Sequence, residues 1–420
     1  MSNSVETGVN ATGNRIWITA FVFCFLTMVI DGADVMLLAY SLSSLKDEFN
    51  LTSLEAGSLA SYTLAGMAVG GIYGGWLADR LGRVKAVVFS VLLFSIGTIF
   101  LGFTHSYVEF AVVRGVSALG LGSVYVVCNT LMAEYVPTRY RNTVLGSLQA
   151  GWSVGYIVAT LLAKWILPSY GWRPLFYTGA VPIAMALLMW KMVPEPATWL
   201  RVREQAKRLA ASGATLVKEK GKFNQIFSSP KAARMFALWA VTAGFLQFGN
   251  YGVNNWMPSY LESELGMKFK TMTTFLVGTY GASILGKVLA GYVADKVGRR
   301  TVFAFGCLGT ALFLPIIVLF NNPQNILWLL IVFGFLYGVP YSVNATYMTE
   351  SFEAKYRGSA VGGAYNVGRI GAALSPAVIG FFATRDSIGF GFLLVGAAYL
   401  ICGLIPAIFI RDKQYDPVRE

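Results

Sequence analysis

The chain has 420 residues, of which 55% are hydrophobic and 13% are charged. Soluble domains average about 25% charged residues, so this composition excludes an ordinary soluble protein. The formal net charge of +12 would suit a nucleic acid partner, but the Lys and Arg residues lie in loops between long apolar runs, which argues against one.

Apolar runs recur along the chain. The first six lie at about 17–41, 55–78, 84–103, 107–131, 142–165 and 173–193, and six more lie at about 232–257, 271–294, 300–320, 325–348, 359–383 and 388–410. A helix of about 24 residues is about 36 Å long, enough to cross a hydrocarbon core of about 30 Å. Because a backbone in lipid must satisfy its own hydrogen bonds, we predict an all-α membrane protein with 12 transmembrane helices. The first run lacks the features of a cleaved signal and is interpreted as a retained span.

Lys and Arg are distributed unevenly between the two sides that these spans define. If the N-terminus is cytoplasmic, 24 of them lie in cytoplasmic loops and six in outer loops. Positive loops stay on the cytoplasmic side, so we predict that both termini are cytoplasmic.

The chain repeats itself with one offset. Gly-Trp-Leu-Ala-Asp-Arg-Leu-Gly-Arg begins at Gly75, and Gly-Tyr-Val-Ala-Asp-Lys-Val-Gly-Arg begins 216 positions later, at Gly291. The same offset relates Glu134 to Glu350 and Asp34 to Asn250. We therefore predict a six-helix N-terminal half (1–193), a cytoplasmic central loop (194–231) and a six-helix C-terminal half (232–420). In the loop, residues 201–209 are either an interfacial amphipathic helix or part of a positively charged tether, which we favour.

These motifs resemble those of the major facilitator superfamily, whose signature follows the second helix and recurs after the eighth. Arg114-Gly115 with Leu119-Gly120-Leu121-Gly122 resembles its fourth-helix motif, and Asp31-Gly32-Ala33-Asp34 resembles the first-helix motif of the aromatic acid:proton symporter family. The fifth helix lacks the Gly-Pro pairing of drug/proton antiporters, which favours symport or uniport. The resemblance implies two halves that rock about a central site.

Five ionisable residues fall inside predicted spans, where such groups are functional candidates. Asp31 and Asp34 share one helix face about one turn apart, and two carboxylates in a low dielectric cannot both ionise cheaply. We predict that at least one couples transport to protons, with a fixed ion pair between helices as the alternative. The resemblance implies a part in proton transfer or substrate contact for Arg114, with Asp31 or Asp34 as a partner.

The other two are cations in the C-terminal half. Arg369 lies twelve residues beyond Arg357, about 18 Å along a helix and close to the midplane. A substrate carboxylate is our predicted partner, and an acidic residue of another helix is the alternative. Lys287 either contacts substrate or snorkels towards the interface.

Polar and aromatic residues at helical spacing suggest the remaining lining of an aromatic carboxylate site. We name Tyr251, Asn254, Asn255, Trp256, Tyr337, Tyr341, Asn344, Gln149, Trp152, Tyr365 and Asn366 as candidate substrate contacts, each of which is alternatively a packing residue.

The two signature loops are predicted to hold the inside-closed state. Asp79 with Arg83 in the first loop and Asp295 with Arg299 in the second should pair with nearby helix ends. The expected partners are Glu134, Arg139, Arg141, Glu350 and Arg357. A solvated loop charge that only sets topology is the alternative for each.

We expect proton-driven uptake of a small organic anion across a bacterial inner membrane, either an aromatic acid or a ring-cleavage dicarboxylate such as cis,cis-muconate. The proton gradient is the expected driving force, with no cofactor, no metal and a monomeric transporter. A facilitator of neutral solutes such as sugars is the main rival, although a midplane arginine argues against it. A membrane enzyme or sensor is disfavoured, because one histidine, His105, and four dispersed cysteines offer no catalytic or metal cluster.

Overall fold

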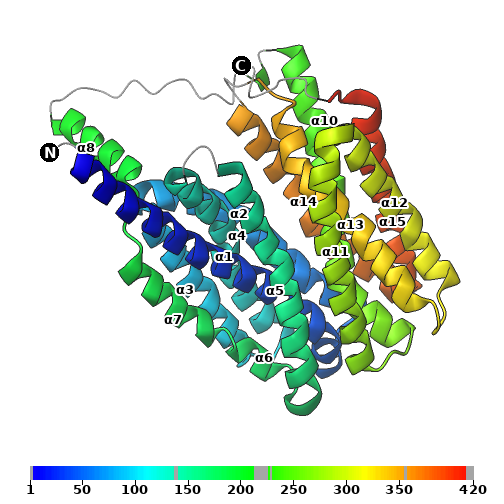
Figure 1. The fold of residues 1–420 in the computed structure, drawn as a ribbon. Helices are drawn as coiled ribbons and strands as arrows, with labels where there is room; N and C mark the ends of the chain where they lie inside the picture. The colour runs from blue at the N-terminus through cyan, green and yellow to red at the C-terminus, as the bar shows by residue number, and fades with distance from the viewer. Residues whose placement is uncertain (1–2, 137–140, 212–225, 228, 354–356, 413–420) are drawn as a thin grey trace. The chain divides into compact units, whose positions relative to one another are not determined.

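The computed structural model of the chain describes residues 3–136, 141–211, 226–227, 229–353 and 357–412 and is helical over most of them (Figure 1). The helices, in chain order, are α1 (Asn3–Glu48), α2 (Ser53–Leu81), α3 (Arg83–Leu101), α4 (Tyr107–Tyr135), α5 (Arg141–Tyr170), α6 (Arg173–Tyr177), α7 (Ala180–Met192), α8 (Ala197–Ala211), α10 (Pro230–Ser259), the π-helix η2 (Tyr260–Glu264), α11 (Phe269–Val297), α12 (Arg299–Phe320), α13 (Ile326–Thr349), α14 (Arg357–Arg385) and α15 (Ile388–Phe409).

Membrane-spanning length and composition are found in ten segments of the described chain, with α6 and α7 together counting as one. Two more long helices, α2 with 29 residues and α10 with 30, complete the set. The predicted all-α architecture of twelve membrane helices is confirmed. Residues 201–209, for which a positively charged tether was favoured over an amphipathic helix, are helical and lie within α8.

The run predicted at 173–193 is found as one span, Arg173–Met192, whose helix is divided into α6 and α7 around Thr178 and Gly179. Pro182 lies in the first turn of α7, where a proline is tolerated because its missing N–H would have no partner there. The same proline cannot donate to the carbonyl of Thr178, so one continuous helix would lose that bond.

The chain divides into two compact units. Unit 1 comprises Met1–Leu37, Gly66–Ala159 and Ser169–Val217, and unit 2 comprises Leu38–Ala65, Thr160–Pro168 and Lys218–Glu420. Within unit 1, α3 packs against α4 and α7. Within unit 2, α10 packs against α14, α11 against α13 and α12 against α15. The boundaries of the two six-helix halves remain a prediction.

The internal repeat is visible in how closely the helices approach each other. A Cβ atom added to Gly70 would lie 2.1 Å from the carbonyl oxygen of Leu119, and one added to Gly286 would lie 2.1 Å from that of Phe335. Both residues of the second contact follow those of the first by 216 positions. Since only glycine permits so close an approach, the crossings of α2 with α4 and of α11 with α13 are built on equivalent contacts.

The surface repeats as well. Four large hydrophobic side chains form an exposed stripe on α2 and four more form the equivalent stripe on α11, at Val69, Ile72, Tyr73 and Trp76 and at Leu285, Val288, Leu289 and Tyr292. Each stripe ends in a cation–π contact, with Arg80 4.4 Å from the Trp76 ring centroid and Lys296 4.3 Å from that of Tyr292. An apolar stripe that ends in an aromatic residue and a cation suits a lipid-facing surface and its interface with water.

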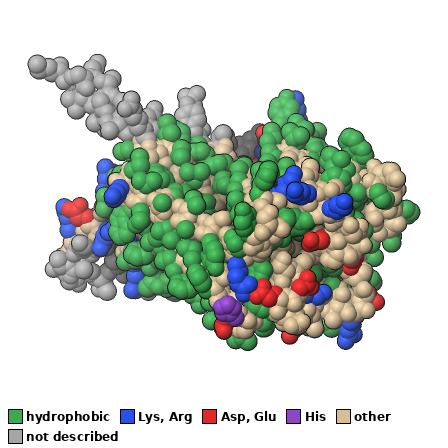
Figure 2. Space-filling model, turned by 90° about the horizontal axis from the view of Figure 1, so that it is seen from below, with side chains coloured by type: hydrophobic (Ala, Val, Ile, Leu, Met, Phe, Trp, Pro, Cys, Tyr) green, Lys and Arg blue, Asp and Glu red, His purple; other side chains and the backbone are tan. Residues whose placement is uncertain are grey.

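Figure 2 shows one face of the molecule with its side chains coloured by type. Hydrophobic side chains cover much of this view, and acidic and basic side chains occupy smaller patches. A largely apolar surface fits a membrane protein.

Candidate functional site

A buried ion pair in unit 1 joins α1 and α4. Arg114 Nη1 lies 2.6 Å from Asp34 Oδ2, and Arg114 Nη2 donates to the Asp34 carbonyl oxygen at 3.2 Å. Thr98 of α3 donates to Asp34 Oδ1 at 2.6 Å. Three helices therefore converge on Asp34, whose carboxylate is matched by a permanent cation.

Asp31 lies one turn earlier on α1 and is fully buried. The indole Nε1 of Trp152 on α5 donates to its Oδ2 at 2.9 Å. The Asp31 carboxyl group thus accepts from a neutral indole, whereas the Asp34 carboxylate is paired with a charged guanidinium. The two acidic residues that the sequence treats almost alike are therefore distinguished by their partners.

Gly32, between the two acidic residues, makes the Trp152 contact possible. A Cβ atom on Gly32 would lie 2.7 Å from the Trp152 carbonyl oxygen, and one on Gly155 would lie 2.1 Å from that of Val29. Any larger residue at these positions forces α1 and α5 apart. The Asp-Gly-x-Asp pattern thus has a packing reason for its glycine as well as a chemical reason for its acids.

Another predicted contact of unit 1, Gln149, lies in a polar patch. Gln149 Nε2 donates to Asn129 Oδ1 at 3.2 Å, and Asn129 Nδ2 donates to the Tyr125 carbonyl at 2.7 Å. The patch joins α4 to α5 by uncharged groups.

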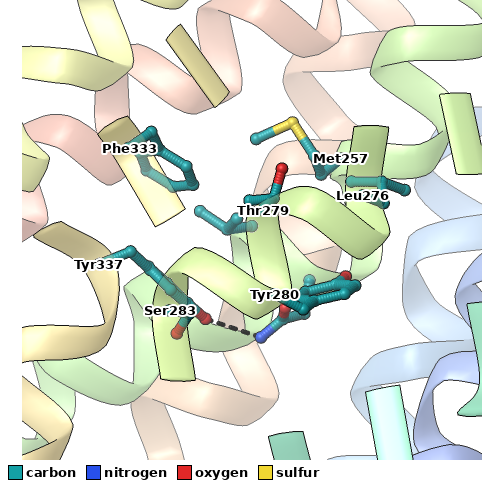
Figure 3. A pocket seen from close by; sticks show the side chains of 9 residues that line it. Met257, Leu276, Thr279, Tyr280, Ser283, Phe333 and Tyr337 are labelled. Atoms are coloured by element: carbon teal, nitrogen blue, oxygen red, sulfur yellow. Dashed lines mark hydrogen bonds between the residues drawn. The ribbon is translucent and has the colours of Figure 1, made fainter. Parts of the chain in front are cut away.

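In unit 2 the position equivalent to Asp34 is Asn250, and its environment is neutral. Tyr337 of α13 donates its hydroxyl proton to Asn250 Oδ1. Asn254 Nδ2 donates to the Asn250 carbonyl at 2.9 Å and to the Tyr337 hydroxyl at 2.7 Å, the dashed line in Figure 3. An amide and a phenol thus replace the ion pair of the first half.

The remaining predicted contacts of unit 2 have varied surroundings. Asn255 donates to the Tyr251 carbonyl at 2.8 Å, and Trp256 Nε1 donates to the Pro376 carbonyl at 3.0 Å. The hydroxyl of Tyr341 lies 2.6 Å from that of Tyr399. The Trp256 bond ties α10 to α14 and the Tyr341 contact ties α13 to α15, whereas the Asn255 bond stays within α10.

The last predicted substrate contacts lie on three helices, α11, α13 and α14. Arg369 is 8% exposed, and Lys287 is half-buried on α11. Asn344 is buried on α13. The backbone carbonyl of Tyr365 accepts from Gln247 Nε2 at 2.9 Å, whereas the exposed Asn366 bonds only its own helix, at the Gly362 carbonyl, among the described residues. Gln247 was missed by the sequence reasoning.

Each signature loop centres on its last arginine. Arg83 Nη1 lies 3.1 Å from Asp79 Oδ1, and Arg83 Nε lies 2.8 Å from Glu134 Oε1. In the second half Arg299 Nη2 lies 2.8 Å from Asp295 Oδ1, and its Nε lies 3.4 Å from Glu350 Oε1.

The remaining expected loop partners are Arg357, Arg139 and Arg141. Arg357 Nε donates to the Phe352 carbonyl at 3.0 Å. Arg139 and the side chain of Arg141 lie outside the described residues.

A carboxylate completes each signature loop, and neither was expected from the sequence. Glu195 accepts from the N–H groups of Val84 and Lys85 at 3.1 and 3.0 Å, and Asp412 accepts from Arg300 N–H at 2.7 Å. Both acids sit against a glycine with positive φ, Gly82 at 123° and Gly298 at 98°. Each carboxylate therefore caps the N-terminus of the helix after its loop, where the helix dipole favours negative charge.

The segment that carries Glu195 is held to unit 1 by two further bonds. Trp199 Nε1 donates to the Asp79 carbonyl at 3.0 Å, and the Thr198 hydroxyl donates to Glu134 Oε2 at 2.6 Å. The start of the predicted central loop is thus held against the first signature loop by hydrogen bonds. The nearest signal in the sequence was an acid between two prolines, Pro194 and Pro196.

Metal binding is not supported by these clusters, since no three His, Cys, Asp or Glu side chains among the described residues are grouped to hold an ion. The buried Asp31, Asp34 and Arg114 lie together within the helix bundle of unit 1.

Comparison with known proteins gives a consistent result. Residues 24–284 and 270–420 match the sequence profile of the Major Facilitator Superfamily. The chain is 64% identical over 405 residues to the cis,cis-muconate transport protein of Acinetobacter baylyi, covering 96% of this chain and 97% of that one. It is 28% identical over 397 residues to a probable 4-methylmuconolactone transporter of Cupriavidus pinatubonensis, covering 92% and 89%. The crystal structure of a D-xylose–proton symporter superposes with a TM-score of 0.78 at 20% identity, covering 95% of this chain and 99% of that one, a likeness of fold.

Proposed function

The chain belongs to the major facilitator superfamily and is a multi-pass membrane transporter, and from that premise we propose that it imports a small organic carboxylate together with protons. The proposed substrate is cis,cis-muconate, the compound that appears in the name of the relative with 64% identity. The observation that carries the proton coupling is the buried group of Asp31, Asp34 and Arg114 in unit 1.

Asp31 is our proposed proton carrier. Arg114 already supplies a permanent positive charge to Asp34, so protonating Asp34 would leave a buried guanidinium without its counter-ion, at a high energetic cost. Asp31 has a neutral donor, the Trp152 indole, which can stay in contact with either protonation state through rotation of the carboxyl group. Asp34 and Arg114 then position α1 and α4 around the proton site.

The substrate carboxylate is proposed to bind Arg369, with Lys287 as the second cation for a dicarboxylate. Arg369 is buried on α14 and remains charged at any physiological pH. Because Arg114 forms an ion pair with Asp34, it is a weaker candidate for substrate contact than the sequence alone suggested. The signature loops, with Arg83 and Arg299 at their centres, are proposed to open and close the cytoplasmic side during alternating access.

The protein is proposed to work as a monomer in the bacterial inner membrane, with both termini in the cytoplasm. The cytoplasmic placement of the termini is supported by the excess of Lys and Arg in the loops assigned to that side.

Uptake into proteoliposomes tests the proposal. Labelled muconate should accumulate when the outside is made acidic and should only equilibrate without a pH gradient. Asp31→Asn should abolish accumulation while retaining exchange, because a neutral amide cannot release a proton. Glu109→Gln, at the exposed first turn of α4, is the matched control and should accumulate normally. Accumulation by Asp31→Asn at the wild-type level, or indifference of wild type to the gradient, would contradict proton symport.

A facilitator of neutral solutes is the second candidate. The neutral cluster of Asn250, Asn254 and Tyr337 favours it, since uncharged hydrogen-bonding groups are what a sugar requires. A panel of labelled benzoate, 4-hydroxybenzoate, muconate and xylose decides between the two: carboxylates alone should be taken up, and uptake of xylose alone would establish the rival.

A further inference from the structure

A glutamine of α10 holds the helix that carries Arg369. Gln247 is 5% exposed, and its Nε2 donates to the Tyr365 carbonyl oxygen of α14 at 2.9 Å. In a regular helix the same carbonyl accepts the N–H of the residue four positions further on, which is Arg369. The amide of Gln247 is therefore bonded to the turn of backbone from which the Arg369 side chain projects.

A second bond holds α14 on the other side of Arg369. The Ser375 hydroxyl donates to the Phe248 carbonyl oxygen of α10 at 2.6 Å. Between the two bonds the helices touch, since a Cβ atom on Gly371 would lie 2.1 Å from the Gly244 carbonyl oxygen. Arg369 thus lies on a segment of α14 that is attached to α10 four residues before it and six residues after it.

The sequence of this segment explains why the attachment matters. Four of the fifteen residues from Gly362 to Pro376 are glycines, and Pro376 lies inside the helix. Glycine and proline are the residues that least favour a helix, and the proline leaves the Ala372 carbonyl without its helical donor. The path of α14 near Arg369 therefore depends on its contacts with α10.

The internal repeat shows what Gln247 replaces. It follows Asp31 by 216 positions, and Gly368 follows Trp152 by the same number. In unit 1 the indole of Trp152 donates to the Asp31 carboxyl group. In unit 2 the glycine leaves room for the amide to reach the main chain, since a Cβ atom on Gly368 would lie 3.0 Å from Gln247 Nε2. The same position of the fold thus holds a titratable acid in one half and a fixed donor in the other.

The bond to Tyr365 requires a donor at position 247. A carbonyl oxygen only accepts, so an ionised carboxylate there would have no proton to offer it, whereas an amide donates at every pH. The residue type at this position therefore fits a role in holding α14 and does not fit one in carrying a proton.

We propose that Gln247 is a positioning residue for substrate binding: through Tyr365 it fixes the direction from which Arg369 meets the substrate carboxylate. A guanidinium binds a carboxylate through two parallel N–H groups, so its affinity depends on its orientation. This inference rests on the proposed function, in which Arg369 binds the substrate. It assigns the Asp31-equivalent position of the second half to anion binding.

The variant Gln247→Met tests the inference, because methionine has a similar length and no N–H to donate. The dissociation constant of muconate is measured by isothermal titration calorimetry on the purified full-length protein. We expect a Kd at least about fivefold higher than that of wild type, the effect of one hydrogen bond, and a similar rise in Ser375→Ala. Thr242→Val is the matched control. It removes a buried hydroxyl that donates to the Leu238 carbonyl of its own helix, α10, and should keep the Kd within about twofold.

A double-variant cycle separates positioning from a general loss of packing. In an Arg369→Lys background, where the ammonium has no planar fork to orient, Gln247→Met should change the Kd by less than about twofold. A purely structural role would give the same loss in both backgrounds. If Arg369→Lys binds too weakly to measure, the comparison of Gln247→Met with Thr242→Val decides alone. Thermal unfolding of each variant checks that it is folded.

The outcomes are distinct from those for the proposed function. A wild-type Kd in Gln247→Met, or an equal loss in both backgrounds, would overturn the positioning role and leave Gln247 as a packing residue. A wild-type Kd in Arg369→Gln, which lacks the positive charge, would instead show that the substrate carboxylate binds elsewhere, and would overturn that part of the proposed function.

Discussion

Arg114 and Asp34 form an ion pair that is almost completely withdrawn from solvent, with exposed side-chain fractions of 0% and 4% and an N–O distance of 2.6 Å. Such a pair costs a large desolvation energy to assemble, and its geometry must be good to recover it. The bidentate contact of Arg114 with the carboxylate and the carbonyl of one residue, together with Thr98, provides that geometry.

Breaking this pair should be strongly destabilising. Asp34→Asn leaves the Arg114 charge buried without its counter-ion, at a cost of about 3–5 kcal/mol, and should lower the apparent Tm of the detergent-solubilised protein markedly. The double variant Asp34→Leu with Arg114→Met should recover most of the lost stability, because no isolated charge remains, while uptake stays abolished. A double variant less stable than Asp34→Asn would show that the pair contributes more than mutual neutralisation.

Close helix contacts give a second prediction. Gly70→Ala and Gly286→Ala each place a methyl group 2.1 Å from a carbonyl oxygen of the neighbouring helix, so both should reduce stability and activity. Gly115→Ala and Gly281→Ala are matched controls, since a Cβ atom there meets nothing within 4 Å. The controls should be neutral or up to about 1 kcal/mol more stable, because alanine favours a helix over glycine. Apparent Tm and uptake rate measure the four variants side by side.

The carboxylate caps of the signature loops give a third prediction. Glu195→Ala removes the acceptor of two N–H groups at the start of α3 and should cost about 0.5–2 kcal/mol. Asp412→Ala should have a similar effect at α12. Glu204→Ala, which breaks the exposed pair with Arg208 at side-chain exposures of 77% and 64%, should change stability by less than about 1 kcal/mol. If Glu195→Ala proved as mild as Glu204→Ala in thermal unfolding, the capping assignment would be refuted.

A fourth prediction concerns pH and the π-helix η2. Burial, and to a smaller extent the negative charge of Asp47, raise the pKa of Glu262 above its usual value of 4.5, while a hydrogen bond with Ser43 lowers it. Because the folded-state pKa is the higher one, this glutamate contributes stability below about pH 4.5 that is lost as the pH rises through the raised value.

The variant Glu262→Gln isolates that contribution. It stays neutral at every pH, so it should be more stable than wild type at neutral pH and should lose this advantage at pH 4.5. Apparent Tm measured from pH 4.5 to 7.5 gives the comparison. Parallel curves for the two proteins would rule out Glu262 as the titrating group.

The sequence alone determined the number of membrane helices, the two-fold repeat and the class of protein. These properties are local. A membrane span is recognised from about twenty consecutive apolar residues, and the repeat is recognised from matching residues such as Gly75 and Gly291. The candidate ionisable residues followed from the same local rule. The Asp31 and Asp34 pair, however, remained almost symmetric, because both lie on one face of one helix.

Only the tertiary structure decided which acid has which partner. Trp152 reaches Asp31 and Arg114 reaches Asp34 because α5 and α4 cross α1 and its neighbours at heights set by glycine contacts far apart in sequence. For the same reason, the sequence could not predict that Glu195 caps α3 or that Asn254 Oδ1 lacks a hydrogen-bond donor among the described residues. A hydrogen-bond partner is chosen by where two helices approach, and that distance depends on side chains of both helices at once.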